Sequence, residues 1–150
     1  MYKHILVASD LTDLALPALR AAVASARQWN AKLTALHVVE PLREARPWVT
    51  TLAPPDVEMF ERLMEQEAGA CKSLLTQQLS HAAGGSPLPI HEVVISRGPS
   101  SDTILAEAQS RQVDLIVVGT HGRRGLKHML LGSVAERIVR TSPCAVLVAR

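Results

Sequence analysis

Residues 113–140, VDLIVVGTHGRRGLKHMLLGSVAERIVR, decide the fold. The apolar run at 114–118 lacks polar alternation, which is typical of a parallel strand covered on both faces. A glycine-containing segment, 119–132, follows, and the spacing of Val134 and Ile138 then predicts a helix. A buried strand, a loop and a helix in this order form one unit of an α/β sheet.

The same unit recurs along the rest of the chain, where apolar runs alternate with segments of helical spacing. The pattern predicts one domain, residues 1–150, containing a doubly wound open parallel sheet with helices on both faces. The third strand alternates in part and is expected nearer an edge. Strands are expected at 4–9, 32–39, 89–96, 114–118 and 144–149, with helices from about 12 to 29, from 57 to just before 84, from 100 through 108 and from 132 through 139.

Two of these helices carry more specific predictions. Thr12 or Asp13 is expected to cap the first helix. The long helix from Val57 has apolar residues at every third or fourth position, and this stripe is expected to face the core. The stripe consists of Phe60, Met64, Ala68, Cys71, Leu75 and Leu79.

Composition excludes several classes of protein. With 47% hydrophobic and 20% charged residues the chain is an ordinary globular one. Its 16 basic and 14 acidic side chains are too balanced for sequence-independent binding of nucleic acid or a membrane surface. No apolar run approaches the roughly 20 residues that insertion into a bilayer needs. Cys71 and Cys144 lack CxxC spacing and no leader is apparent, so a cytoplasmic protein with reduced thiols is expected.

The predicted ligand site lies at the carboxyl ends of the first and fourth strands. Ligands of doubly wound sheets bind outside the strand ends, where the strand order reverses. Asp10 follows the first strand and the segment 119–122 follows the fourth, so both are expected to flank one crevice. The histidines and cysteines show no metal-ligand spacing, so no zinc site is expected.

Glycine is concentrated in the segment after the fourth strand. Four of the eight glycines of the chain lie there, at 119, 122, 125 and 132. Glycine lets backbone N–H groups approach a ligand closely. Gly132 and Ser133 open a helix, whose amino end suits phosphate. The segment is therefore a candidate phosphate-binding loop.

The residues alone leave alternatives open. The loop could be an ordinary connection, because neither GxxxxGK[ST] nor GxGxxG is present. Asp10 could be the N-cap of the following helix, and His121 could be a water-exposed loop residue. His37 is expected to be a hydrogen-bonded interior residue instead of a ligand. Four loop cations could neutralise phosphate or remain solvated: Arg123, Arg124, Lys127 and His128.

The pattern Gly119-x2-Gly122-x9-Gly132-Ser133 resembles the nucleotide-binding motif G-x2-G-x9-G-[ST] of the universal stress protein family. The segments ILVASD, HVVE and PCAVLV resemble that family in order and spacing, and the similarity covers essentially the full chain. It implies strand order 3-2-1-4-5, as in adenine nucleotide alpha hydrolase-like folds. It also implies a cytoplasmic stress-response protein, and a homodimer formed through the terminal strand, 144–149.

The resemblance implies a binding site for ATP, or for ADP or AMP, with Mg²⁺ held through the phosphates. Asp10 would accept from the ribose hydroxyls, and Ala8 and Val38 would pack against adenine. Other residues would surround the ribose and phosphates: Gly119, His121, Gly122, Arg123, Gly132, Ser133 and Val134.

Three functions are compatible with these features. A nucleotide-dependent regulator would present a loop ordered by ATP to an unknown regulatory protein. A slow ATPase or self-phosphorylating protein would use Ser133 or Thr120, although no paired base and nucleophile is evident. A dimeric interaction module would bind no nucleotide. A phosphoacceptor receiver is disfavoured because its acidic cluster is missing, and ASDLTD stands where an ATP pyrophosphatase would have SGGxDS.

Overall fold

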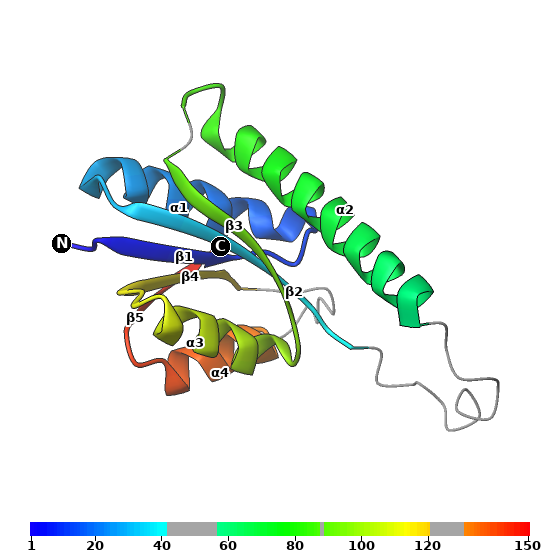
Figure 1. The fold of residues 1–150 in the computed structure, drawn as a ribbon. Coiled ribbons are helices and arrows are strands. Elements are labelled where there is room, and N and C mark those ends of the chain that lie inside the picture. The colour runs from blue at the N-terminus through cyan, green and yellow to red at the C-terminus, as the bar shows by residue number, and fades with distance from the viewer. Residues whose placement is uncertain (42–56, 88, 121–130) are drawn as a thin grey trace.

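The computed structural model describes residues 1–41, 57–87, 89–120 and 131–150, and its strands form one parallel sheet with helices on both sides (Figure 1). The described ranges contain five strands, four α-helices and one short 3-10 turn, η1. In chain order the elements are β1 (His4–Ala8), η1 (Asp13–Ala15), α1 (Leu16–Trp29), β2 (Lys32–Val39), α2 (Val57–Ala83), β3 (Ile90–Arg97), α3 (Ser100–Ser110), β4 (Leu115–Gly119), α4 (Ser133–Thr141) and β5 (Ala145–Ala149).

The sheet has the order β3-β2-β1-β4-β5, which confirms the predicted fold class. β1 lies at its centre and pairs in parallel with both neighbours, since Ile5 is opposite Leu33 of β2 and Leu115 of β4. Such a strand has no solvent-facing side, which explains its unbroken apolar sequence. β3 is an edge strand, as its partial alternation predicted.

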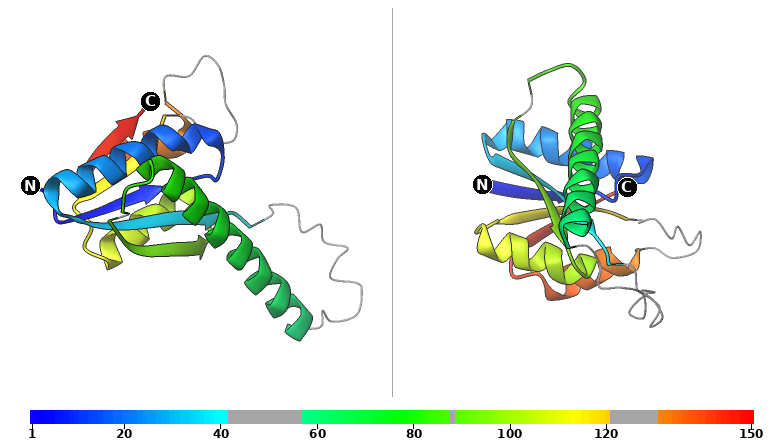
Figure 2. Two further views of the ribbon diagram at one scale, coloured as in Figure 1. Left: turned by 90° about the horizontal axis from the view of Figure 1, so that it is seen from above. Right: turned by 45° about the vertical axis from the view of Figure 1, so that its right-hand side comes forward.

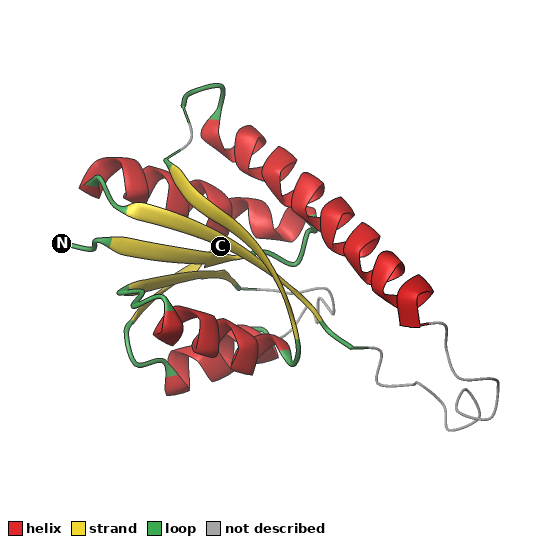
Figure 3. Cartoon of the chain, in the orientation of Figure 1, coloured by secondary structure: helices red, strands yellow, loops and turns green. Residues whose placement is uncertain are grey.

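The helices cover the two faces in pairs, as the colouring by element in Figure 3 and the turned views in Figure 2 make visible. α1 and α2 pack with Ile5 and Val7 in one buried cluster, whereas α3 and α4 pack with Leu6 and Leu36 in another. Neighbouring residues of one strand thus enter opposite cores, because successive side chains of a strand alternate between faces.

The start of the first helix differs from the prediction. The chain forms the 3-10 turn η1 before α1 begins, and Thr12 is the N-cap of that turn without any capping bond from its side chain. Ala15 is the N-cap of α1, so neither Thr12 nor Asp13 caps the α-helix. The carboxyl end is as expected: α1 stops at Trp29, and Asn30 adopts the left-handed conformation (φ 51°) that commonly ends helices.

The long helix has the predicted bounds, but its apolar stripe is buried only in part. Of the expected stripe, Leu75 and Leu79 are fully buried, and Ala83 joins them. Phe60, by contrast, is 55% exposed. The amino-terminal part of α2 extends past the sheet (Figure 1), so the apolar periodicity correctly predicted the helix but not the length of core beneath it.

Candidate functional site

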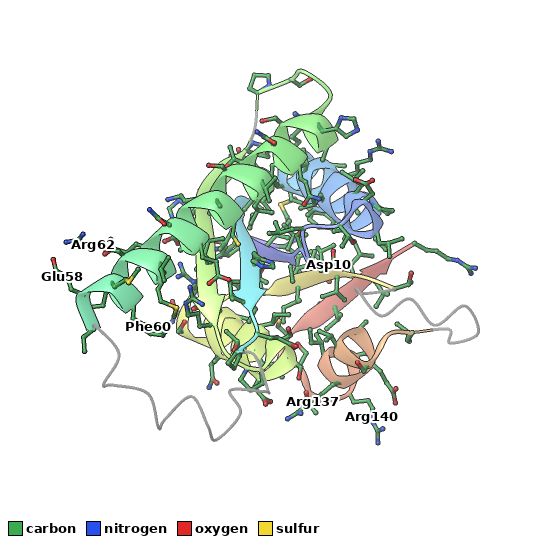
Figure 4. All side chains as sticks on the ribbon, turned by 90° about the vertical axis from the view of Figure 1, so that its right-hand side faces the viewer. Asp10, Glu58, Phe60, Arg62, Arg137 and Arg140 are labelled. Carbon is green, nitrogen blue, oxygen red and sulfur yellow. The ribbon has the colours of Figure 1, made fainter. Side chains whose placement is uncertain are left out.

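Those sequence-predicted residues that the structure describes lie toward the carboxyl end of the sheet, where β1 and β4 lie side by side. Val7 of β1 is opposite Val117 of β4. From these strands the chain leaves in opposite directions, to β2 through α1 and to β5 through α4. Figure 4 looks onto this end, with Asp10 near the centre of the view. The strand order therefore reverses where the sequence placed the ligand crevice.

Asp10 holds a tight turn directly after β1. Its Oδ1 accepts hydrogen bonds from the backbone N–H of Thr12 (2.9 Å) and from the Thr12 hydroxyl (2.7 Å). This is an Asx turn, in which an aspartate side chain bonds the backbone two residues on. Asp10 is consequently not the N-cap of the helix, which was the structural alternative. A carboxylate offers about four acceptor positions, so these two bonds do not exhaust its capacity.

The turn is supported from α2 by side chains that the sequence did not single out. The Ser9 hydroxyl donates to Oε1 of Gln78 (2.8 Å) and accepts from the N–H of Leu11 (3.0 Å). Nε2 of Gln78 donates to the carbonyl of Thr12 (3.0 Å). Leu11 has φ 64°, which a leucine rarely adopts, so this network holds a conformation that the local sequence would not favour.

His37 reinforces the same turn from β2. It is 3% exposed, and its Nδ1 lies 2.8 Å from the carbonyl oxygen of Ser9. Because a carbonyl oxygen only accepts, Nδ1 must carry the proton and donate. The prediction of a hydrogen-bonded interior histidine is confirmed.

Ala8 and Val38 lie on the α3 and α4 side of the sheet. Val38 is 9% exposed and belongs to the buried cluster of that face, and Ala8 is half-buried against it. Both residues are near the carboxyl ends of their strands, Ala8 as the last residue of β1. They form an apolar surface beside the Asp10 turn, of the kind against which a flat aromatic group packs.

Two backbone hydrogen bonds bring together the ends of the glycine-containing segment. The N–H of Thr120 donates to the carbonyl of Ala149 (3.0 Å), and the N–H of Gly132 donates to the carbonyl of Thr120 (2.6 Å). Gly119 ends β4, opposite Ala149. The Gly132 N–H is thus engaged within the chain, unlike the phosphate donor that the motif implied.

The amino end of α4 begins immediately after this junction. Gly132 is its N-cap, with φ −68° and ψ 156°, a conformation open to any residue, so a need for positive φ does not explain this glycine. Ser133 is exposed and Val134 half-buried. No side chain of the described residues caps α4, and its first N–H groups and positive dipole end remain suited to an anion.

Several predicted site residues lie outside the described residues. These are His121, Gly122 and Arg123, together with the further loop residues Gly125, Arg124, Lys127 and His128.

A different anion arrangement occurs at the start of α3, which the sequence did not reveal. Oε1 of Glu40, just after β2, accepts from the Ser100 hydroxyl (2.7 Å) and from the Ser100 N–H (3.3 Å). A carboxylate from another segment therefore occupies the amino end of α3. The only sequence signal is an acidic residue after a strand, which is too common to predict a contact with a residue sixty positions away.

An open groove along α3 offers no comparable site. Its charged lining residues are already paired: Arg97 with Glu67, Asp102 with Arg137, and Glu107 with Arg111. The hydrogen bond from Ser96 and the pairing with Arg111 lower the pKa of Glu107, which keeps that carboxylate charged and paired.

The described ranges also bear on metals and membranes. They contain no group of three or more His, Cys, Asp or Glu side chains placed to hold a metal ion. No helix within them has both the length and the apolar character to cross a bilayer.

Known proteins match the whole chain. The profile of the universal stress protein family matches residues 1–150. The universal stress protein YxiE of Bacillus subtilis is 34% identical over 154 residues, covering 100% of both chains. The structure of universal stress protein UspA from Lactobacillus plantarum superposes with a TM-score of 0.78 at 31% identity, covering 99% of this chain and 98% of that one. A universal stress protein in complex with cAMP has the same fold, with a TM-score of 0.67 at 23% identity over 99% and 97% of the two chains.

Proposed function

The chain belongs to the universal stress protein family, and from that premise we propose that it binds an adenine nucleotide and acts as a nucleotide-dependent regulator. The observation that carries the proposal is a juxtaposition. The Asp10 carboxylate and the amino end of α4, which no described side chain caps, follow neighbouring strands, β1 and β4, at one end of the sheet. An acceptor for a sugar diol and a donor set for phosphate are the polar groups that a nucleotide requires.

The residues take distinct roles in this proposal. Asp10 accepts from the ribose hydroxyls, and Ala8 and Val38 pack against adenine. The N–H groups of Ser133 and Val134 donate to phosphate oxygens, because the first N–H groups of a helix have no partner within it. Five more residues are assigned through the family motif: Gly119 and Gly132, where a missing Cβ allows close approach, and His121, Gly122 and Arg123 from the segment outside the described residues.

ATP is the proposed ligand in the first instance, with ADP, AMP and cyclic nucleotides as competitors for the same site. A relative of the same fold was crystallised with cAMP, which supports an adenine ligand in general. Mg²⁺ would be held by the phosphates, consistent with the absence of a three-ligand cluster in the described ranges. The ion would neutralise phosphate charge and bridge phosphate oxygens.

A regulatory role is favoured over fast catalysis by the polar groups near α4. Ser133 is exposed, and no described histidine or carboxylate is hydrogen bonded to its hydroxyl as a general base would be. Slow hydrolysis or self-phosphorylation at Ser133 or Thr120 is the competing activity. The regulator would present its nucleotide-bound surface to a protein partner.

A homodimer through residues 144–149 is part of the proposal. β5 is an edge strand with an apolar sequence, and its Leu147 is 37% exposed. An exposed apolar edge invites pairing with another strand, and a second copy would cover it.

The decisive experiment starts from the purified full chain. Denaturing it and identifying released small molecules by chromatography and mass spectrometry is expected to yield an adenine nucleotide. Calorimetric titration of nucleotide-free protein with ATP, ADP, AMP and cAMP, with GTP as the comparison, is expected to rank adenine above guanine. The proposal would be contradicted if the protein releases no purine and if none of these nucleotides gives heat at millimolar concentration. The remaining function would then be the dimeric interaction module that binds no nucleotide.

Hydrolysis is tested in the same preparation. Incubation with ATP labelled in the γ-phosphate is expected to leave the nucleotide intact over many binding cycles. Labelled protein that disappears in Ser133→Ala or Thr120→Val would instead establish the self-phosphorylating alternative.

A further inference from the structure

The amino-terminal part of α2 extends beyond the body that its carboxyl-terminal part helps to build. The helix has 27 residues, about 40 Å at 1.5 Å per residue, whereas the strands beneath it have five to eight residues. Its buried residues are confined to the last third, at Leu75, Leu79 and Ala83. Figures 1 and 2 show its amino end projecting from the carboxyl end of the sheet.

Arg97 of β3 bonds α2 at residues 64 and 67. Nη2 of Arg97 donates to the carbonyl of Met64 (3.2 Å) and to Oε2 of Glu67 (2.7 Å). These bonds fix the base of the projection. Residues 57–63 therefore continue as helix beyond the point where the sheet supports it.

This projecting part carries large apolar side chains on its surface. The exposed fractions are 65% for Val57, 60% for Met59 and 55% for both Phe60 and Leu63. Single exposed apolar residues are ordinary, but four within seven positions of one helix form a contiguous patch, and such patches mark interaction sites. We name this patch, residues 57, 59, 60 and 63, the α2 patch.

The α2 patch continues the core-facing stripe of the helix. From Phe60 the stripe runs through Met64, Ala68, Cys71 and Leu75 at steps of four, four, three and four residues, the spacing of one helix face. Leu75 is fully buried in the core and Phe60 is not. In Figure 4, Phe60 lies on the side of α2 nearer the sheet, whereas Glu58 and Arg62 lie on the outer side. The α2 patch is therefore apolar like the buried part of the stripe, but its side chains remain exposed.

Charge indicates what kind of molecule would cover the patch. Residues 57–68 contain four glutamates and one arginine, a formal charge of −3. Glu58 pairs with Arg62, and Glu67 pairs with Arg97. Glu61 and Glu65 have no ion pair with any described residue, and they stand four positions apart, where like charges repel on a helix. A basic partner would relieve this repulsion.

A second copy of the chain is a poorer match for the same surface. Pairing two α2 patches across a twofold axis would bring the same glutamates against each other, and like-charge contacts disfavour association. The electrostatics therefore favour a chemically different partner.

We propose that the α2 patch, with Glu61 and Glu65 at its border, is a docking site for an amphipathic helix of a partner protein that has an apolar face flanked by lysine or arginine. The mode is the packing of one helix against another through apolar positions three and four residues apart. The proposal stands apart from nucleotide binding, because none of its residues belongs to the Asp10 and α4 site.

The test uses the full chain and three synthetic peptides of about 18 residues, five helical turns. The first peptide has a leucine stripe flanked by lysines, the second has glutamates in place of the lysines, and the third has the composition of the first in scrambled order. Fluorescence anisotropy of labelled peptide measures binding. The lysine peptide is expected to bind at least about tenfold more tightly than the other two, since both apolar and charge complementarity contribute.

Matched variants locate the binding surface. The double variant Phe60→Ser/Leu63→Ser is expected to weaken the lysine peptide at least about tenfold, because it removes the apolar anchors. Leu74→Ser, an equally exposed leucine (50%) outside the patch, is expected to leave affinity unchanged. Glu61→Lys/Glu65→Lys is expected to reverse the preference toward the glutamate peptide. Circular dichroism and unchanged thermal unfolding verify that each variant is folded.

Several results would overturn the proposal. These are undetectable binding of the lysine peptide at millimolar protein, equal binding of all three peptides, or full affinity in the Phe60→Ser/Leu63→Ser variant. The oligomeric state, measured by analytical ultracentrifugation, is the last test. An oligomer that dissociates only in this double variant would mean that a second copy covers the patch.

Discussion

α3 and α4 begin at the same end of the sheet and pack on the same face, yet among the described residues only the amino end of α3 is bonded by a side chain from another segment. At α3 the carboxylate of Glu40 accepts from both the hydroxyl and the N–H of Ser100. At α4 the N-cap is Gly132, and no described side chain takes the place that Glu40 takes at α3. Each amino end carries a partial positive charge. The chain supplies the anion at α3 itself, and at α4 the proposed nucleotide would supply it.

The difference follows from the strands that precede the two helices. β3 is at the edge of the sheet, so α3 starts away from the point where strand order reverses. β4 is next to the central β1, so α4 starts beside the Asp10 turn. A carboxylate of the chain itself at the amino end of α4 would occupy the predicted crevice. At α3, the Glu40 carboxylate only connects the end of β2 to a helix. One helix end thus carries a stabilising contact, and the other belongs to the proposed binding site.

The largest effect is expected from a variant that puts a carboxylate at the amino end of α4. Gly132→Asp puts a carboxylate at the N-cap, and the backbone there (φ −68°) accepts any residue. The proposed site is expected to lose ATP affinity by at least about 100-fold, roughly 2.7 kcal/mol, because the new carboxylate takes the N–H groups and repels phosphate. Calorimetric titration with ATP measures the loss.

Pro99→Asp is the matched control, since Pro99 is the exposed N-cap of α3. It adds the same charge to the other amino end and is expected to leave ATP affinity unchanged. Equal losses in the two variants would mean that the phosphates do not sit at α4.

Asp10→Ala tests whether the α4 end belongs to one site with the β1 turn. ATP affinity is expected to fall by about 1 to 3 kcal/mol, the contribution of hydrogen bonds to a charged acceptor. Asp13→Ala controls for removing a carboxylate three residues away, at an exposed position of η1. If both variants bind ATP like the wild type, Asp10 serves the Asx turn alone.

Glu40→Gln removes the carboxylate at the amino end of α3 and tests the comparison at that helix. The free energy of unfolding in urea is expected to fall by about 0.5 to 1 kcal/mol, because an exposed helix end loses a charged partner. ATP affinity is expected to stay the same. A loss of affinity without a loss of stability would place Glu40 in the ligand site.

The smallest effect concerns the opposite end of the sheet, where His4 responds to pH. Burial lowers the pKa of His4 below its ordinary 6.5, against the raising effect of the hydrogen bond to the Arg111 carbonyl, and His91 and Lys32 lower it further while Asp114 raises it. A lowered folded-state pKa means that the neutral ring is the stable form. Its contribution is present above about pH 6.5 and is lost as the pH falls through the folded-state value.

The comparison is a pair of urea titrations between pH 5 and 8, one of the wild type and one of His4→Gln. The wild type is expected to lose stability toward acid more steeply than the variant, while the pH dependence of ATP affinity stays equal in both. Parallel stability curves would remove His4 as the source.

Local sequence patterns predicted most of the architecture. β2 at Lys32–Val39 and α2 at Val57–Ala83 have the expected bounds because β-branched runs, helical spacing and the Gly84-Gly85 stop are local signals. They did not predict how far the core extends beneath α2, because periodicity identifies an apolar face but not what packs on it. Phe60 was therefore expected in the core and is exposed.

The places of Asp10 and Gly132 in the fold were predictable, and the hydrogen bonds around them were not. The strand ends and the glycine spacing predicted that Asp10 follows β1 and that Gly132 opens α4, and both residues have these positions, whereas their part in a binding site stays a prediction. Ser9 bonds Gln78 at the Asp10 turn and Ser100 bonds Glu40 at the amino end of α3, and each contact spans sixty or more residues. A single sequence contains no local signal for such pairs, so they came only from the fold.

The junction at Thr120 has a practical consequence for handling the protein. Its N–H donates to the carbonyl of Ala149 and its carbonyl accepts from the N–H of Gly132, so one residue connects the end of β5 to the start of α4. An affinity tag or fluorescent reporter fused after Arg150 would crowd that junction. One fused before Met1, which is 97% exposed and precedes the amino end of the central strand β1, would leave it undisturbed.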